Sequence, residues 1–151
     1  SLRRIVTTLS RLWVSLIVRQ RVRMRLFDHI DLRVRNLAEA DPFYAKILPA
    51  LGFPTRFEEK DCVSYDAVSD HPKPECINLT EDRAHVPNRT RIAFWRDTRE
   101  DVDSFAAVLK EAGARNIEGP ELCTEYSPGY SAVFFEDPCG NRFEVCCRCE
   151  K

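Results

Sequence analysis

Between residues 26 and 147 the apolar positions follow two different periods in turn. Residues 26–34 alternate between apolar and polar, which predicts a half-buried strand with His29 on its polar face. Apolar residues then recur at helical spacing over 37–51, and Gly52 directly afterwards is a typical helix stop. Three more strands are expected in this half of the chain, at residues 55–59, 62–67 and 75–80.

The second half repeats this order. Residues 89–95 read as a strand, and Thr98 followed by Asp101 resembles the capping pattern that begins a helix. Gly113 is placed to end that helix. Further strands are expected at 116–118, 130–135 and 142–147. The pattern therefore predicts an α+β fold built from two βαβββ modules in tandem, at about 26–80 and 89–147.

Charge is distributed unevenly along the chain. The net charge is −1, yet residues 1–23 hold six Arg and no acidic residue, so residues 24–151 have 17 basic residues against 24 acidic ones. An acidic body argues against nucleic-acid binding. We interpret 1–23 as an appended basic segment and 24–151 as one domain. A targeting segment or a membrane-surface helix would have the same composition, but membrane contact by 1–23 is the less favoured interpretation.

Cysteine usage favours a reducing compartment. The seven Cys are an odd number, which predicts free thiols and a cytoplasmic protein. Cys146 and Cys149 form a C-x-x-C pair that suits zinc or redox chemistry, but no second pair stands at a matching spacing. Small apolar residues near a C-terminal strand are the favoured interpretation.

Two polar side chains stand out in otherwise apolar strands. Glu144 lies between Phe143 and Val145, and a carboxylate there is costly to bury unless it is paired, bound to metal or facing a cavity. His29 has the same character in the first strand. Before Glu144, the stretch Asp137-Pro-Cys-Gly-Asn141 predicts a tight turn between the last two strands.

In this order, the segments FDHIDLRV, FYAKILPALGF, RIAFWRDTREDVDSF and YSAVFFEDPCGNRFEV resemble the vicinal oxygen chelate superfamily, which includes glyoxalase I, bleomycin-resistance proteins and extradiol dioxygenases. The resemblance covers about residues 26–147. It implies curved mixed sheets around a ligand cup, and a homodimer. It also implies one metal-ligand position on each of four strands, which fall on His29, Asn78, Arg91 and Glu144.

Arg91 departs from the pattern of the family. A guanidinium has no acceptor lone pair and repels cations, so it cannot hold a metal. The remaining set of His29, Asn78 and Glu144 suits zinc, nickel or iron poorly and manganese or magnesium somewhat better. Alternatively, Arg91 forms a bidentate pair with Glu144, or presents its charge to an anionic ligand. Trp95, on the same face as Arg91, and Tyr130 are the other candidate ligand contacts.

Three functions remain open at this point, the third of which is a partner-binding or scaffold role for the dimer, with the basic segment as the interaction element. The first is a divalent-metal lyase, isomerase or dioxygenase acting on a small oxygenated substrate, with His29, Asn78 and Glu144 holding the ion and Glu144 moving a proton. The second is a protein that uses no metal and binds a drug or an anionic metabolite in the same cup. The sequence alone does not decide whether the chain is an enzyme.

Overall fold

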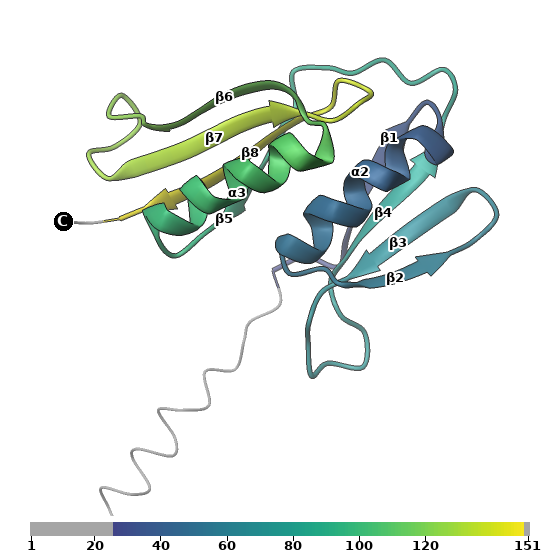
Figure 1. Cartoon of the computed structure of the whole chain (residues 1–151). Helices are drawn as coiled ribbons and strands as arrows, with labels where there is room; N and C mark the ends of the chain where they lie inside the picture. Colours follow the sequence, from purple (N-terminus) through teal and green to yellow (C-terminus); the bar gives the residue numbers. More distant parts are fainter. Residues whose placement is uncertain (1–25, 150–151) are drawn as a thin grey trace, which may run out of the picture.

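The computed structural model describes residues 26–149 as two modules, each with four strands and one helix (Figure 1). The first module holds β1 (His29–Val34), α2 (Leu37–Ala50), β2 (Thr55–Glu58), β3 (Cys62–Asp66) and β4 (Cys76–Glu81). The second holds β5 (Arg91–Trp95), α3 (Arg99–Ala112), β6 (Arg115–Leu122), β7 (Tyr130–Glu136) and β8 (Arg142–Arg148). The predicted βαβββ order is confirmed in both modules. The predicted appended segment, 1–23, lies outside the described residues.

Each module forms its own mixed sheet. Sheet A has the strand order β1-β4-β3-β2 and sheet B the order β5-β8-β7-β6. The first and last strands of each module pair in parallel, and the other pairs are antiparallel. The parallel pairing needs a long crossover, which begins with the helix of each module. Among the described residues the two sheets do not join, so β1 and β5 are both edge strands.

Alternation along the strands decides which face of each sheet is buried. In β1, Leu32 and Val34 are buried while Asp31 and Arg33 are exposed, and the parallel neighbour β4 buries Ile77 and Leu79. Successive side chains in a strand point to opposite faces, so each sheet has one apolar face and one polar face. His29 belongs to the polar face, as the sequence predicts.

Both helices begin and end where the sequence indicates. The side chain of Asn36 accepts a hydrogen bond from the backbone N–H of Glu39 at the start of α2, and Gly52 follows its last turn with a φ of 99°. At the start of α3, Thr98 Oγ1 accepts a hydrogen bond from the N–H of Asp101 at 3.1 Å. Gly113 ends α3 in the left-handed conformation that glycine adopts without strain.

Strand β6 is much longer than the sequence predicts. The expectation was three residues at 116–118, whereas β6 spans Arg115–Leu122. Its side chains are nearly all exposed, so no alternation of apolar and polar residues marks it. Pairing with β7 stabilises it instead, with two register shifts along the pair. A Cβ at Gly119 would lie 2.7 Å from the backbone oxygen of Ala132, which explains why only glycine fits there.

The two modules share one hydrophobic core. Helices α2 and α3 lie side by side (Figure 1), and both sheets turn their apolar faces toward them. From α2, Phe43 packs on Phe135 of β7 and Tyr44 packs edge-on against Phe143 of β8, with ring centroids 6.4 and 6.2 Å apart. The helix of the first module therefore contacts the sheet of the second, and the polar face of each sheet points away from this core.

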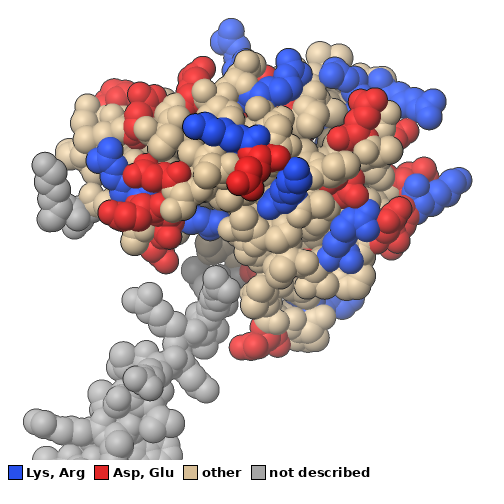
Figure 2. Space-filling view, viewed as in Figure 1, with Lys and Arg blue, Asp and Glu red and all other residues tan. Residues whose placement is uncertain are grey.

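The surface mixes both signs of charge. Figure 2 shows Lys and Arg interspersed with Asp and Glu over the face that it displays, without a broad basic field. None of the helices in the described residues is long and apolar enough to span a membrane.

Candidate ligand-binding site

The polar face of sheet B carries a buried carboxylate with two partners. Glu144 in the central strand β8 is buried, and the hydroxyl of Tyr130 in β7 donates a hydrogen bond to its Oε1. Nη1 of Arg91, in the neighbouring strand β5, lies 3.8 Å from Oε2. The expected pairing of Arg91 with Glu144 is therefore present, but as a single long contact and not as the predicted bidentate pair, because Tyr130 holds the other oxygen.

Burial keeps the hydroxyl of Tyr130 protonated, so that it can donate a hydrogen bond. Loss of solvent, followed by its contacts with Cys146 and Glu144, raises the pKa of Tyr130 well above the usual range of tyrosine. The ring belongs to a small apolar cluster on this face, together with Cys123, Ala132 and Cys146. A protonated phenol is a strong donor to a carboxylate.

A second arginine stands next to Arg91. Arg142 is the register partner of Arg91 in the parallel β5–β8 pair, so both side chains leave the sheet on the same face. Nε of Arg142 lies 3.7 Å from Oε1 of Glu136, and the guanidinium of Arg91 lies 4.7 Å from the ring centre of Phe134. The side chains of Arg91 and Glu144 are 40% and 8% exposed, so the cation is accessible while the carboxylate is recessed.

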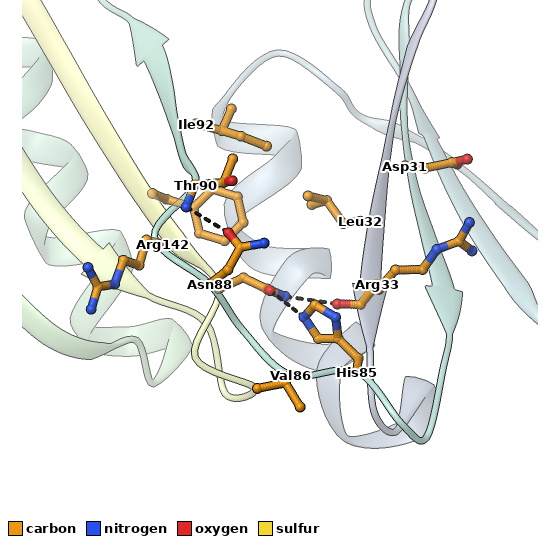
Figure 3. Close-up of a pocket in the computed structure, with 11 residues that line it drawn as sticks. Asp31, Leu32, Arg33, His85, Val86, Asn88, Thr90, Ile92 and Arg142 are labelled. Carbon is orange, nitrogen blue, oxygen red and sulfur yellow. Dashed lines mark hydrogen bonds between the residues drawn. The ribbon is translucent and has the colours of Figure 1, made fainter.

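Two hollows border these arginines. One, of about 300 Å³, lies against Arg91, Phe134 and Arg142. The other, of about 340 Å³, opens between the edge strands β1 and β5, where Leu32 and Ile92 line it (Figure 3). Both include Arg142 and Phe143, so they are adjacent. Their volumes are at the lower end of those typical of small-molecule sites.

The hollow in Figure 3 is closed at one end by His85. Its Nε2 lies 2.7 Å from Oδ1 of Asn141, in the β7–β8 turn, and Asn141 in turn donates to the backbone oxygen of Arg33 in β1. His85 belongs to the polar loop between β4 and β5. The structure shows it half-buried, hydrogen-bonded and at the junction of the two modules.

The polar face of sheet A holds the other predicted metal ligands. Nδ1 of His29 lies 2.9 Å from a carboxylate oxygen of Asp28, and this contact raises the pKa of His29. The amide of Asn78 donates to Asp31, while its oxygen accepts a hydrogen bond from Ser64 at 2.8 Å. No hydrogen bond or ion pair joins this face to that of sheet B within residues 26–149.

These donors do not fit a divalent metal as the structure arranges them. Oε1 of Glu144 is taken by Tyr130, Oε2 faces the cationic Arg91, and the oxygen of Asn78 accepts from Ser64. Within the part of the chain that the structure describes, no three His, Cys, Asp or Glu side chains lie close enough to hold an ion. The predicted ligand set of His29, Asn78 and Glu144 stays a prediction.

The remaining predicted contact, Trp95, does not border either hollow. It is 54% exposed at the end of β5, and its Nε1 donates to Asp97. Sequence reasoning missed Arg142, although it lies two residues before Glu144 in the same strand. Because side chains two apart in a strand share a face, that spacing is the signal that could have found it.

Comparison with known proteins agrees with the fold. The family model of the Glyoxalase/Bleomycin resistance protein/Dioxygenase superfamily matches residues 26–145. The chain belongs to this superfamily. Among curated proteins, none matches it in sequence.

Several solved structures of the superfamily share its fold. A glyoxalase/bleomycin resistance protein from Albidiferax ferrireducens is 22% identical, with a TM-score of 0.64, over 82% of this chain and 100% of the other. A family enzyme from Burkholderia phytofirmans is 18% identical, with a TM-score of 0.64, over 81% and 98%. The fosfomycin resistance protein FosX from Listeria monocytogenes is 17% identical, with a TM-score of 0.60, over 82% and 93%. At these identities the similarity concerns the fold alone.

Proposed function

We propose that this superfamily member binds a small anionic molecule without a metal, at the polar face of sheet B. The observation that carries the proposal is the position of Arg91. It stands where the resemblance places a metal ligand, it faces the recessed Glu144, and its side chain remains 40% exposed beside a hollow of about 300 Å³. A guanidinium in that place recognises carboxylate or phosphate oxygens and not a cation.

Arg142 strengthens the attraction for an anion. Arg91 and Arg142 are register partners, and both are more exposed than the carboxylates that they face, Glu144 and Glu136. Glu118 and Glu136 also line the adjoining hollow, so a ligand there is held by hydrogen bonds from the two guanidiniums and not by a net positive charge. Phe134 supplies an apolar surface next to them, so the site suits an anion with an apolar or aromatic part.

Titration calorimetry with phenylphosphonate, and with benzyl alcohol as a neutral counterpart, tests the proposal. We expect the phosphonate to bind and the alcohol not to bind. Because charged hydrogen bonds contribute roughly 1.5–3 kcal/mol each, Arg91→Gln is expected to weaken phosphonate binding by about 10- to 100-fold. Fosfomycin, after which the Listeria resistance protein is named, is a second phosphonate to include.

Arg148→Gln is the matched control. Arg148 belongs to β8, the strand that pairs with β5, and its guanidinium lies 5.0 Å from the ring centre of Tyr130, but it borders neither hollow. Binding should be unchanged in this variant. Equal binding of the phosphonate by wild type and Arg91→Gln, or loss of binding only in Arg148→Gln, would contradict the proposed site.

The buried Glu144 supports a second candidate function, that of an enzyme in which this carboxylate moves a proton. The two candidates differ in the fate of the ligand. For a binding protein, NMR spectra of the compound after long incubation show it unchanged. Conversion of the compound that Glu144→Gln abolishes would favour the enzyme.

The expected homodimer is part of the same proposal. The edge strands β1 and β5 each have one paired neighbour among the described residues, and Ile92 and Phe94 of β5 are only half-buried. Such edges favour pairing with another chain. Light scattering during size-exclusion chromatography should give twice the chain mass of 17.5 kDa, whereas a monomer at all concentrations would rule the dimer out.

A further inference from the structure

Two cysteines near the C-terminus lie in direct contact. Cys147 is the sixth residue of β8, and Cys149 follows the end of that strand. Their sulfur atoms are 2.9 Å apart. Cys147 is fully buried in the shared core, while Cys149 is half-buried against the same core.

The period of the strand explains why these two thiols meet. Residues two apart in a strand share a face, and their Cα atoms are separated by about 6.8 Å at most, which is the upper end of the range seen in disulfides. Cys146 points to the opposite face, where it joins the cluster around Tyr130. The two thiols in contact are therefore those of a C-x-C motif and not those of the C-x-x-C pair noted in the sequence.

We propose that Cys147 and Cys149 are a reversible oxidation site, which hydroperoxides convert to an intramolecular disulfide. The site lies on the apolar side of sheet B, opposite to the face that carries Arg91 and Glu144. It is therefore independent of the proposed ligand site.

The chemistry takes place in two steps. The sulfur of Cys149 attacks one peroxide oxygen, the O–O bond breaks, and water leaves with the thiol proton, so that Cys149 becomes a sulfenic acid. The sulfur of Cys147 then attacks the sulfur of Cys149, the S–S bond forms, the S–O bond breaks, and a second water leaves with the proton of Cys147. Two thiols lose two electrons and two protons, and hydrogen peroxide is reduced to two waters.

Exposure sets the order of the two thiols. Cys149 is the accessible one, whereas burial, followed by the contact with Cys149, raises the pKa of Cys147 to about 11. Cys147 is therefore protonated at neutral pH and reacts second. A disulfide whose Cα separation lies at the upper end of the usual range is strained, and strained disulfides are easily reduced. We accordingly expect dithiothreitol to reverse the oxidation.

Peptide mapping of the full chain tests this inference. The reduced protein is treated with hydrogen peroxide, unfolded, alkylated and digested with trypsin. Cleavage after Arg142 and Arg148 leaves Cys147 on the fragment 143–148 and Cys149 on 149–151. We expect these two fragments to be joined by a disulfide, and the number of free thiols to fall from seven to five.

Single variants identify the partner of Cys149. The joined fragments should persist in Cys146→Ser and be absent in Cys149→Ser, a change at a half-buried position. Because Cys147 is fully buried, the variant at that position is Cys147→Ala, which is expected to destabilise the fold less than Cys147→Ser. Linkage of Cys149 to Cys146, or full alkylation of Cys149 at a peroxide dose that oxidises the half-buried Cys62 and Cys76, would overturn the proposal.

Discussion

The hydroxyl of Tyr44, in α2 of the first module, donates a 2.6 Å hydrogen bond to Oδ2 of Asp137, in the β7–β8 turn of the second module. Asp137 is fully buried, and it also accepts hydrogen bonds from the backbone and the side chain of Asn141. Asn141 donates onward to Arg33 of β1. The Asp-Pro-Cys-Gly-Asn turn therefore reverses the chain and also connects the two modules by hydrogen bonds.

Removing the hydroxyl of Tyr44 should weaken the whole fold. Tyr44→Phe leaves the buried Asp137 short of a donor, which costs about 1–3 kcal/mol of unfolding free energy. Tyr65→Phe is the matched control, because Tyr65 also donates at 2.6 Å to an aspartate, but Asp41 is partly exposed and retains Arg56. Urea unfolding should show the larger loss for Tyr44→Phe. Equal losses in the two variants would contradict the role given to the turn.

Stability should fall in alkaline solution. Burial raises the pKa of Tyr44, Tyr65 and Tyr130 above the usual value of 10.0 for tyrosine. Above that pH the unfolded chain loses these protons while the folded chain keeps them. Each tyrosine thus contributes stability that is complete below pH 10.0 and is lost as the pH rises, by at most about 1.4 kcal/mol per pH unit.

Urea unfolding midpoints measured below and above pH 10.0 test whether stability falls as the pH rises. The midpoint should decrease with increasing pH in the wild type. The decrease should be shallower in Tyr44→Phe, which lacks one of the three phenols. A midpoint that stays constant or rises through this range would show that the three hydroxyls are not buried as described.

Gly129 should not tolerate a side chain. A Cβ at this position would collide with the backbone oxygen of Cys149, whose own N–H donates to the oxygen of Gly129 at 3.0 Å. Gly129→Ala should therefore detach the end of β8 and lower the thermal midpoint. At Gly113 a Cβ has open space and only the left-handed φ of 81° opposes alanine, at a cost of about 1 kcal/mol. A smaller effect for Gly129→Ala than for Gly113→Ala would be inconsistent with this contact.

Much of the fold is predictable from the sequence because local signals and tertiary structure agree. The caps at Thr98 and Gly113 and the alternation in β1 place those elements correctly. Strand β6 is different, since its exposed residues carry no periodicity and only pairing with β7 defines it. The role of Asp137 also needs the structure, because its partner Tyr44 is 93 residues away.

The candidate site is predictable only in part. Arg91 and Glu144 face each other as expected, because strand order and register place them on neighbouring strands. Two other contacts depend on how the strands pair. Tyr130 binds Glu144 from the other side because β7 pairs with β8, and Arg142 stands next to Arg91 because β5 pairs with β8.

Metal stoichiometry after supplementation tests the central claim, that Arg91 turns an inherited metal position into an anion site. The purified wild type and His29→Ala, each incubated with manganese, zinc or nickel and then desalted, are measured by elemental analysis. We expect far less than one equivalent of each metal, with no difference between the two proteins. One equivalent retained by the wild type and lost in His29→Ala would contradict the claim.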